Sequence, residues 1–197
     1  MSRETERDGY WPVEGKILIL RGTLSGRLAL ALGLCVLLSA DWIYGAEATR
    51  EQIQAAYLYR FLDFVEWPPT APAGVGTFCL CVMGDDRLAK TLENSVSGKS
   101  VSGRPVVVRQ LTEVRQARQC HLLFLTGRRQ TVSAQVSELQ SEPVLTASDV
   151  PGFQNEGGMV AFYFKNDRMQ FEINVENAKK QGISISSRLV QLSRNSK

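Results

Sequence analysis

The stretch TFCLCVMGDD, residues 77–86, sets the pattern from which the rest of the chain can be interpreted. Residues 77–83 are apolar and compact, as in a buried strand, and Asp85 and Asp86 then open a helix over residues 87–95. Acidic side chains suit the positive N-terminal end of a helix, so we assign this pair to the helix start and not to a metal site. A buried strand followed at once by a helix predicts the first unit of an α/β fold.

The same alternation continues along the chain. Further strands are expected at residues 104–111, 120–125 and 143–148, with a short polar helix or turn at 112–119 and a helix at 130–139 between them. Strands that alternate with helices pair in parallel, and the helices cover the faces of the sheet. We therefore predict an α/β fold with a mostly parallel sheet flanked by helices on both faces.

An amphipathic helix is expected before the first strand, over residues 47–65. Its apolar stripe consists of four residues at helical spacing, Ile53, Tyr57, Phe61 and Phe64. Thr49 is the expected N-cap, with Gln52 as its capping-box partner. The sequence Trp-Pro-Pro that follows at 67–69 ends the helix.

The C-terminal part breaks the alternation. Strand-like runs at 159–164 and 168–174 flank the turn residues 165–167, which predicts an antiparallel hairpin. In the second run, residues 169, 171 and 173 are apolar and residues 168, 170, 172 and 174 are polar, so the strand has two unlike faces. Gly157 and Gly158 precede the hairpin, at a turn that needs positive φ or close backbone approach. Short helices are expected at 175–181, capped by Asn174, and at 186–193.

The N-terminal segment resembles a secretory signal. Arg21 and Arg27 flank the start of the apolar run LALALGLCVLL at 28–38, and small residues follow. The run has about eleven residues, whereas a membrane span needs about twenty; an uncleaved anchor over 22–40 is the alternative. We predict a signal peptide over residues 1–46, cleaved after Ala40 or Ala46, and a single exported domain over residues 47–197.

Neither the motifs nor the charge of the chain indicate an enzyme. The sequence contains no motif typical of serine hydrolases, zinc proteases or P-loop proteins. The sole histidine, His121, begins an apolar strand and is interpreted as structural. The net charge is +3, with both signs interspersed and no basic stripe of the kind that binds nucleic acid. We therefore expect no catalytic residues, no cofactor and no nucleic-acid partner.

Three cysteines, Cys79, Cys81 and Cys120, belong to the predicted exported domain. In an oxidising compartment the simplest arrangement is one disulfide and one thiol. Cys81 and Cys120 are on strands that can be neighbours, and their bridge would close a loop of about 39 residues. Cys79 shares a strand face with Cys81 and competes for the same partner. A metal site is not expected, because Cys79-x-Cys81 is tighter than the usual C-x₂₋₄-C spacing.

The predicted partner surface is the first helix or the hairpin region, where the polar face of the second strand is also the predicted edge of a ligand groove. That face presents Arg168, Glu172 and Asn174. Phe162, from the first hairpin strand, is expected beside them as an exposed aromatic anchor.

Several segments together resemble one family. They are IQAAYLYRF at 53–61, FVEWP at 64–68, CVMGDD at 81–86, CHLLFL at 120–125, VLTASD at 144–149, GF at 152–153, GGM at 157–159, FEIN at 171–174 and ISSRL at 185–189. Their order and spacing are similar to those of the YfiR-like family of bacterial periplasmic proteins, over roughly residues 48–193.

The resemblance implies a non-catalytic periplasmic regulator of cyclic-di-GMP output and biofilm behaviour. Such a protein represses an inner-membrane diguanylate cyclase, or a similar sensor, by binding its periplasmic part, and an outer-membrane lipoprotein can relieve the repression. The resemblance also implies a disulfide between Cys81 and Cys120. The namesake's second bridge has no counterpart, because no cysteine follows Cys120. A homodimer is considered as well, and the alternative function is a periplasmic small-molecule-binding module that feeds a sensor kinase or transporter.

Overall fold

The computed structural model describes residues 48–71, 76–166 and 168–195. The predicted signal peptide, residues 1–46, therefore lies outside the described part of the chain. Among the described helices, none combines the length and the apolar character that a membrane crossing requires.

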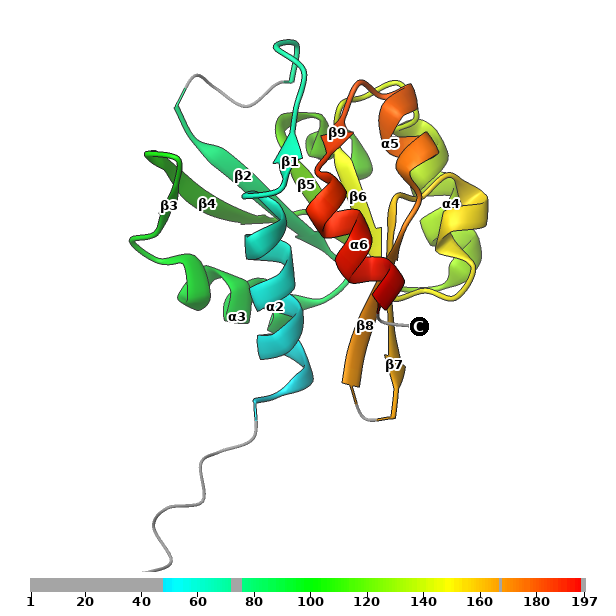
Figure 1. Ribbon diagram of the computed structural model, residues 1–197, viewed down its shortest axis with the longest axis horizontal. Coiled ribbons are helices and arrows are strands. Elements are labelled where there is room, and N and C mark those ends of the chain that lie inside the picture. Colours follow the sequence, from blue (N-terminus) through cyan, green and yellow to red (C-terminus); the bar gives the residue numbers. More distant parts are fainter. Residues whose placement is uncertain (1–47, 72–75, 167, 196–197) are drawn as a thin grey trace, which may run out of the picture. The chain divides into compact units, whose positions relative to one another are not determined.

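Within the described residues, a seven-stranded sheet has the order β3-β4-β2-β5-β6-β7-β8 (Figure 1). Strands β4, β2, β5, β6 and β7 are parallel, whereas β3 and β8 are antiparallel strands at the two edges. Numbered along the chain, the parallel strands have the order 2-1-3-4-5 of a flavodoxin-like doubly wound sheet. The strands are β2 (Phe78–Met83), β3 (Ser100–Val101), β4 (Arg104–Gln110), β5 (Leu122–Leu125), β6 (Leu145–Ser148), β7 (Val160–Lys165) and β8 (Arg168–Ile173). The predicted mostly parallel sheet with a C-terminal antiparallel hairpin is confirmed.

Helices cover both faces of the sheet. One face is covered by α2 (Arg50–Phe61), α3 (Asp86–Val96) and α6 (Ser187–Asn195), which lie in front of the sheet in Figure 1. The other face is covered by η2 (Val114–Gln119), α4 (Arg129–Glu138) and η3 (Phe153–Glu156). The alternation of β2 divides the core accordingly: Leu80 and Val82 pack in the first layer, and Cys81 and Met83 in the second. All six residues of β2 are buried, as expected for a central parallel strand.

Helix α2 has the predicted N-cap, Thr49, but it spans Arg50–Phe61 and is shorter than the predicted range 47–65. Thr49 and Gln52 form the expected capping box, with Gln52 N–H donating to Thr49 Oγ1 at 3.2 Å and Thr49 N–H donating to Gln52 Oε1 at 2.8 Å. The buried face is centred on Ala55 and Leu58 and not on the predicted stripe, whose members Ile53, Tyr57 and Phe64 are only partly buried at its flanks. The helix ends at Phe61, and a short strand follows at Val65–Glu66.

That strand belongs to a small sheet that the sequence pattern did not predict. β1 (Val65–Glu66) pairs antiparallel with β9 (Ser184–Ile185). Ser186 N–H also donates to Phe64 O at 2.9 Å. The pairing ties the end of α2 to the last helix, since β9 lies between α5 (Val175–Lys180) and α6. A two-residue strand has no periodicity to detect, so only its distant partner reveals it.

The β7–β8 hairpin extends beyond its neighbour in the sheet. β7 pairs with β8 over six residues, from Val160 to Lys165, but with β6 over only Val160 and Ala161. The outer half of the hairpin therefore projects past the end of β6, at the lower edge of Figure 1. Asn166 occupies the turn with φ +51°, as a turn residue of this type tolerates.

The glycine pair before β7 is required sterically. Gly157 has φ +96°, in the region that favours glycine. A Cβ on Gly158 would overlap the ring of Phe153, which is 2% exposed. The predicted turn with close backbone approach is thus confirmed, and it fixes the start of the hairpin.

Candidate functional site

The β7–β8 hairpin carries two of the predicted binding residues: Arg168 at its outer end, and Glu172 opposite Ala161, where β7 still pairs with β6. Arg168 is exposed and Glu172 is half-buried, on the polar face of β8. On the opposite face, Met169 and Phe171 are buried in the core, as the alternation predicts. Burial raises the pKa of the Tyr163 hydroxyl, and the negative charge of Glu172 raises it further.

The prediction of Phe162 as an exposed anchor is wrong. Its side chain is 3% exposed and belongs to the core. Its ring stacks on Phe61, with 5.8 Å between centroids and 13° between planes, and also packs against Tyr57, Phe124 and Phe171. The physical cause is α2, which covers this face of β7 and encloses the ring.

Phe164, two residues further along, takes the position expected for Phe162. It points to the same side of β7 but lies beyond the covering helix, and it is 39% exposed. The guanidinium of Arg50, the first residue of α2, lies 4.0 Å from the centroid of its ring. Such an exposed cation–π contact contributes about 0.5–1 kcal/mol and holds the ring in place.

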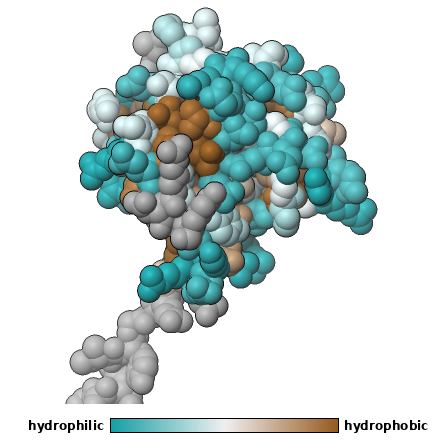
Figure 2. Space-filling model, turned by 45° about the vertical axis from the view of Figure 1, so that its right-hand side comes forward, coloured by the Kyte–Doolittle hydropathy of each residue, from teal (hydrophilic) through white to brown (hydrophobic). Residues whose placement is uncertain are grey.

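Hollows lie on both sides of the hairpin. One of about 330 Å³ is lined by Arg50 and Phe164 among others, and one of about 240 Å³ includes Glu172. The surface shown in Figure 2 is mostly hydrophilic, with a few small hydrophobic areas. In the described residues, the exposed large hydrophobic side chains are Val107, Phe164 and Leu192. We call Arg50, Phe164, Arg168 and Glu172 the hairpin site.

Asn174 has a different role. Its Oδ1 accepts a hydrogen bond from Asn177 N–H at 3.0 Å and so caps α5, as the sequence predicts. The hollow beside Glu172 is lined by neither Asn174 nor Arg168. The structure therefore does not bring the predicted polar residues together around one pocket.

A larger hollow, of about 640 Å³, lies where β2, β4 and β5 begin. Its walls include Trp67, Phe78, Arg104 and His121. The Trp67 indole N–H donates to His121 O at 2.8 Å, and its ring meets the imidazole edge to face at 5.3 Å. The Arg104 guanidinium lies 3.9 Å from the centroid of Phe78 and donates to Thr77 O at 3.0 Å. We call this the Trp67 hollow.

His121 is held neutral beside this hollow. Burial, together with the charge of Arg104, lowers its pKa to about 4. Its Nδ1 accepts the buried N–H of Cys79 at 3.1 Å, so the ring proton belongs on Nε2. Arg104 Nη2 lies 3.2 Å from that Nε2, but a guanidinium only donates, so this close approach adds repulsion and no second hydrogen bond. The ring is a structural acceptor, in agreement with its sequence interpretation.

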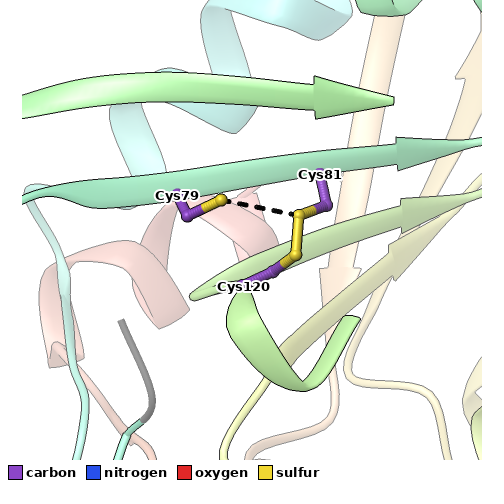
Figure 3. Close-up of side chains that lie close together, drawn as sticks. All are labelled: Cys79, Cys81 and Cys120. Carbon is purple, nitrogen blue, oxygen red and sulfur yellow. Dashed lines mark hydrogen bonds between the residues drawn. A yellow bond between two sulfur atoms is a disulfide. The ribbon is translucent and has the colours of Figure 1, made fainter. Parts of the chain in front are cut away.

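The three cysteines form one buried cluster between β2 and the start of β5 (Figure 3). Cys81 and Cys120 are joined by a disulfide, with 6.1 Å between their Cα atoms, which resolves the alternative that the sequence left open. Cys79 is a buried thiol whose Sγ lies 3.7 Å from Cys81 Sγ. Burial raises the pKa of this thiol, and the charge of Arg109 opposes the effect.

The loops after β2 and β5 lie against each other at the crevice where doubly wound sheets usually bind ligands. This crevice lies at the carboxyl ends of β2 and β5, where the strand order reverses. The backbone of Gly84 packs directly against the carbonyl of Thr126, with no room for a Cβ. Asp85 Oδ1 accepts from Leu88 N–H at 2.9 Å and caps α3, and Asp86 accepts from Gln110. The acidic pair therefore serves the helix start, as predicted.

Sequence reasoning missed Phe164 and the Trp67 hollow for different reasons. Phe164 has the same strand parity as Phe162, and the place where α2 begins decides which of them is covered. The hollow combines side chains from four separate segments, at residues 67, 78, 104 and 121. No spacing in the sequence connects them.

Comparison with protein families gives one match: a family model described as YfiR/HmsC-like covers residues 51–194. The match confirms the resemblance seen in the sequence. A search among curated proteins found no match.

Proposed function

Because the chain belongs to the YfiR/HmsC-like family, whose members are periplasmic regulators of cyclic-di-GMP signalling, we propose that it represses an inner-membrane diguanylate cyclase by binding that protein's periplasmic part. The observation that carries this proposal is the family match over residues 51–194. Family members act through periplasmic partners and are regulatory. The particular target, relief by an outer-membrane lipoprotein, export by a cleaved signal peptide and a homodimer are parts of our proposal.

We place the partner contact at the hairpin site. The hairpin projects past β6, so a partner can approach it from two sides without meeting the sheet. Phe164 supplies an exposed aromatic ring beside the guanidinium of Arg50, and Arg168 is exposed on the opposite face of the hairpin. Aromatic and arginine side chains dominate the binding energy of protein interfaces, particularly when they fill a partner's pocket. Glu172 adds a charge of the opposite sign beside the second hollow.

The test is a deletion and complementation experiment in the native host. Loss of the gene should raise cellular cyclic-di-GMP, and the wild-type gene should restore the lower level. The variant Phe164→Ala combined with Arg168→Glu should fail to restore it while reaching the periplasm in normal amount. An unchanged cyclic-di-GMP level after deletion would refute the proposed target.

A matched control distinguishes loss of the binding surface from loss of folding stability. Val107→Ala truncates another exposed hydrophobic residue, 38% exposed on β4, which is separated from the β7–β8 hairpin by the three strands β2, β5 and β6. It should complement fully. If the hairpin variant also complemented fully, the partner would bind elsewhere. Melting temperatures of the purified variants should agree within a few degrees of the wild type.

The Trp67 hollow favours a second candidate function, a small-molecule-binding module feeding a sensor kinase or transporter. Its volume of about 640 Å³ suits a small ligand, and it offers aromatic faces and one guanidinium. Fractionated periplasmic metabolites should raise the melting temperature of the wild type and not of Arg104→Met. The absence of any shift with all fractions would reject this function.

A further inference from the structure

The buried sulfur cluster of Cys79, Cys81 and Cys120 has no part in the proposed partner contact. We propose that it is a thiol–disulfide exchange site, in which the disulfide of Cys120 moves between Cys81 and Cys79. The protein would then exist as two disulfide isomers with the same composition and the same redox state.

The distances bring all three sulfurs together. The Sγ atoms lie within 4.8 Å of one another, and those of Cys79 and Cys81 are 3.7 Å apart. Both side chains leave the same face of β2, which directs them toward Cys120 (Figure 3). Cys79 Sγ is in contact with Cys81 Sγ, and Cys120 Sγ, the atom that it attacks, lies within 4.8 Å. In-line attack on Cys120 also requires alignment along the S–S bond, so the proposal includes a rotation of the Cys79 side chain to another rotamer.

The backbone also allows either bridge. His121 N–H donates to Cys79 O at 2.9 Å, so Cys120, one residue earlier, is held next to Cys79. Cys120 itself precedes β5, which begins at Leu122, and is not fixed in the strand ladder. A disulfide forms readily when the two Cα atoms are about 4.4–6.8 Å apart. The observed bridge has 6.1 Å between Cα atoms, and the sulfurs of Cys79 and Cys120 lie within 4.8 Å of each other.

The chemistry balances without another reagent. The Cys79 thiolate attacks Cys120 Sγ, the Cys79–Cys120 bond forms, and the Cys81–Cys120 bond breaks. Cys81 leaves as a thiolate and takes up a proton in place of the one that Cys79 lost. One disulfide and one thiol are present before and after, so no oxidant or reductant is consumed.

Burial of the three sulfurs favours exchange within the cluster over exchange with external thiols. Cys79 is 3% exposed and the other two sulfurs belong to fully buried residues, so external thiols have little access. Only the thiolate reacts, and burial keeps its fraction low at neutral pH. Exchange should therefore be slow at pH 7 and accelerate about tenfold per pH unit below the thiol pKa. The Cys79 N–H bond to His121 Nδ1 links the position of the disulfide to the wall of the Trp67 hollow.

The experiment maps the disulfide in the protein purified after export, in which the predicted signal cleavage after Ala40 or Ala46 also removes Cys35. Reduced wild-type protein is oxidised briefly, held at pH 7 or pH 9, quenched in acid at intervals and alkylated under denaturing, non-reducing conditions. Tandem mass spectrometry then locates the alkylated cysteine. We expect label on both Cys79 and Cys81, with the distribution reaching its final value about 100-fold faster at pH 9. Label on Cys79 alone at all times and both pH values would overturn the proposal.

Single substitutions test whether each bridge can form. Cys81→Ala should contain a Cys79–Cys120 disulfide and no free thiol, and Cys79→Ala should contain Cys81–Cys120 and no free thiol. Two free thiols in folded Cys81→Ala protein would also overturn the proposal. If Cys81→Ala does not fold, the wild-type labelling decides the question without it.

Discussion

Replacing Cys120 should lower the free energy of unfolding of the domain by about 4 kcal/mol. This prediction tests whether the Cys81–Cys120 disulfide stabilises the fold. The bridge from Cys81 to Cys120 spans a sequence separation of 39 residues. In the chain-entropy model, the unfolded state gains about 13 cal/mol/K when a loop of this size is opened, which is about 4 kcal/mol at 25 °C. That is a large part of the 5–15 kcal/mol by which typical domains are stable. Cys120→Ala is the informative change, because Cys120 is the shared partner of both possible bridges.

The assay is equilibrium unfolding in urea at 25 °C. Cys79→Ala is the matched control: it removes one buried sulfur from the same cluster but keeps the disulfide, so it should cost only about 1 kcal/mol of packing. Wild-type protein in reductant should match Cys120→Ala within about 1 kcal/mol, since it loses the bridge and keeps the sulfurs. The m-value should rise in both cases, because the unfolded chain becomes more extended. If the Cys120→Ala protein were as stable as Cys79→Ala, the disulfide would not stabilise the domain as predicted.

Three further predictions concern single positions. Gly158→Ala should lower the free energy of unfolding by about 1–3 kcal/mol in the same urea assay, because its methyl group would overlap the buried Phe153 ring; a neutral effect would contradict the packing. His121 has a folded-state pKa of about 4, below its unfolded value, so the unfolded state takes up the proton first. Stability should therefore decrease as the pH falls from about 6.5 to about 4, and His121→Gln should remove that part of the pH dependence; an identical profile for the variant would exclude His121 as its source. Thr49→Ala should cost about 1 kcal/mol, because it removes the capping box with Gln52; Ser at this position should restore most of the loss.

The parts of the fold that follow from short-range chemistry were predictable. The apolar run of β2 and the acidic pair after it belong to one local unit, and Asp85 caps α3 as expected. The turn before β7 needs glycine because Phe153 packs against Gly158, and two adjacent glycines are a visible signal. In each case the residues that make the contact are separated by a few positions, so their pattern can be recognised in the sequence.

The candidate site was predicted only in part. The parity of β8 correctly separates the polar face of Arg168 and Glu172 from the buried Met169 and Phe171. The alternation of side chains along a strand does not predict how much of the strand a helix covers. Phe162 is enclosed because α2 passes over it, whereas Phe164 is exposed because α2 begins at Arg50.

By itself, then, the sequence determined the strand and helix alternation, the parallel sheet and its terminal hairpin, because these depend on periodicity and on local capping. The tertiary structure decided between Cys79 and Cys81, which the residues alone left open, and it confirms the Cys81–Cys120 disulfide that the family resemblance implies. It also decided that Gly84 packs against the carbonyl of Thr126 at the carboxyl ends of β2 and β5, and that Trp67 contacts His121, 54 positions away in the chain. The physical reason is the same for all of these features. A periodic pattern fixes which side chains share a face, but the contacts of that face depend on where distant segments begin, end and pack.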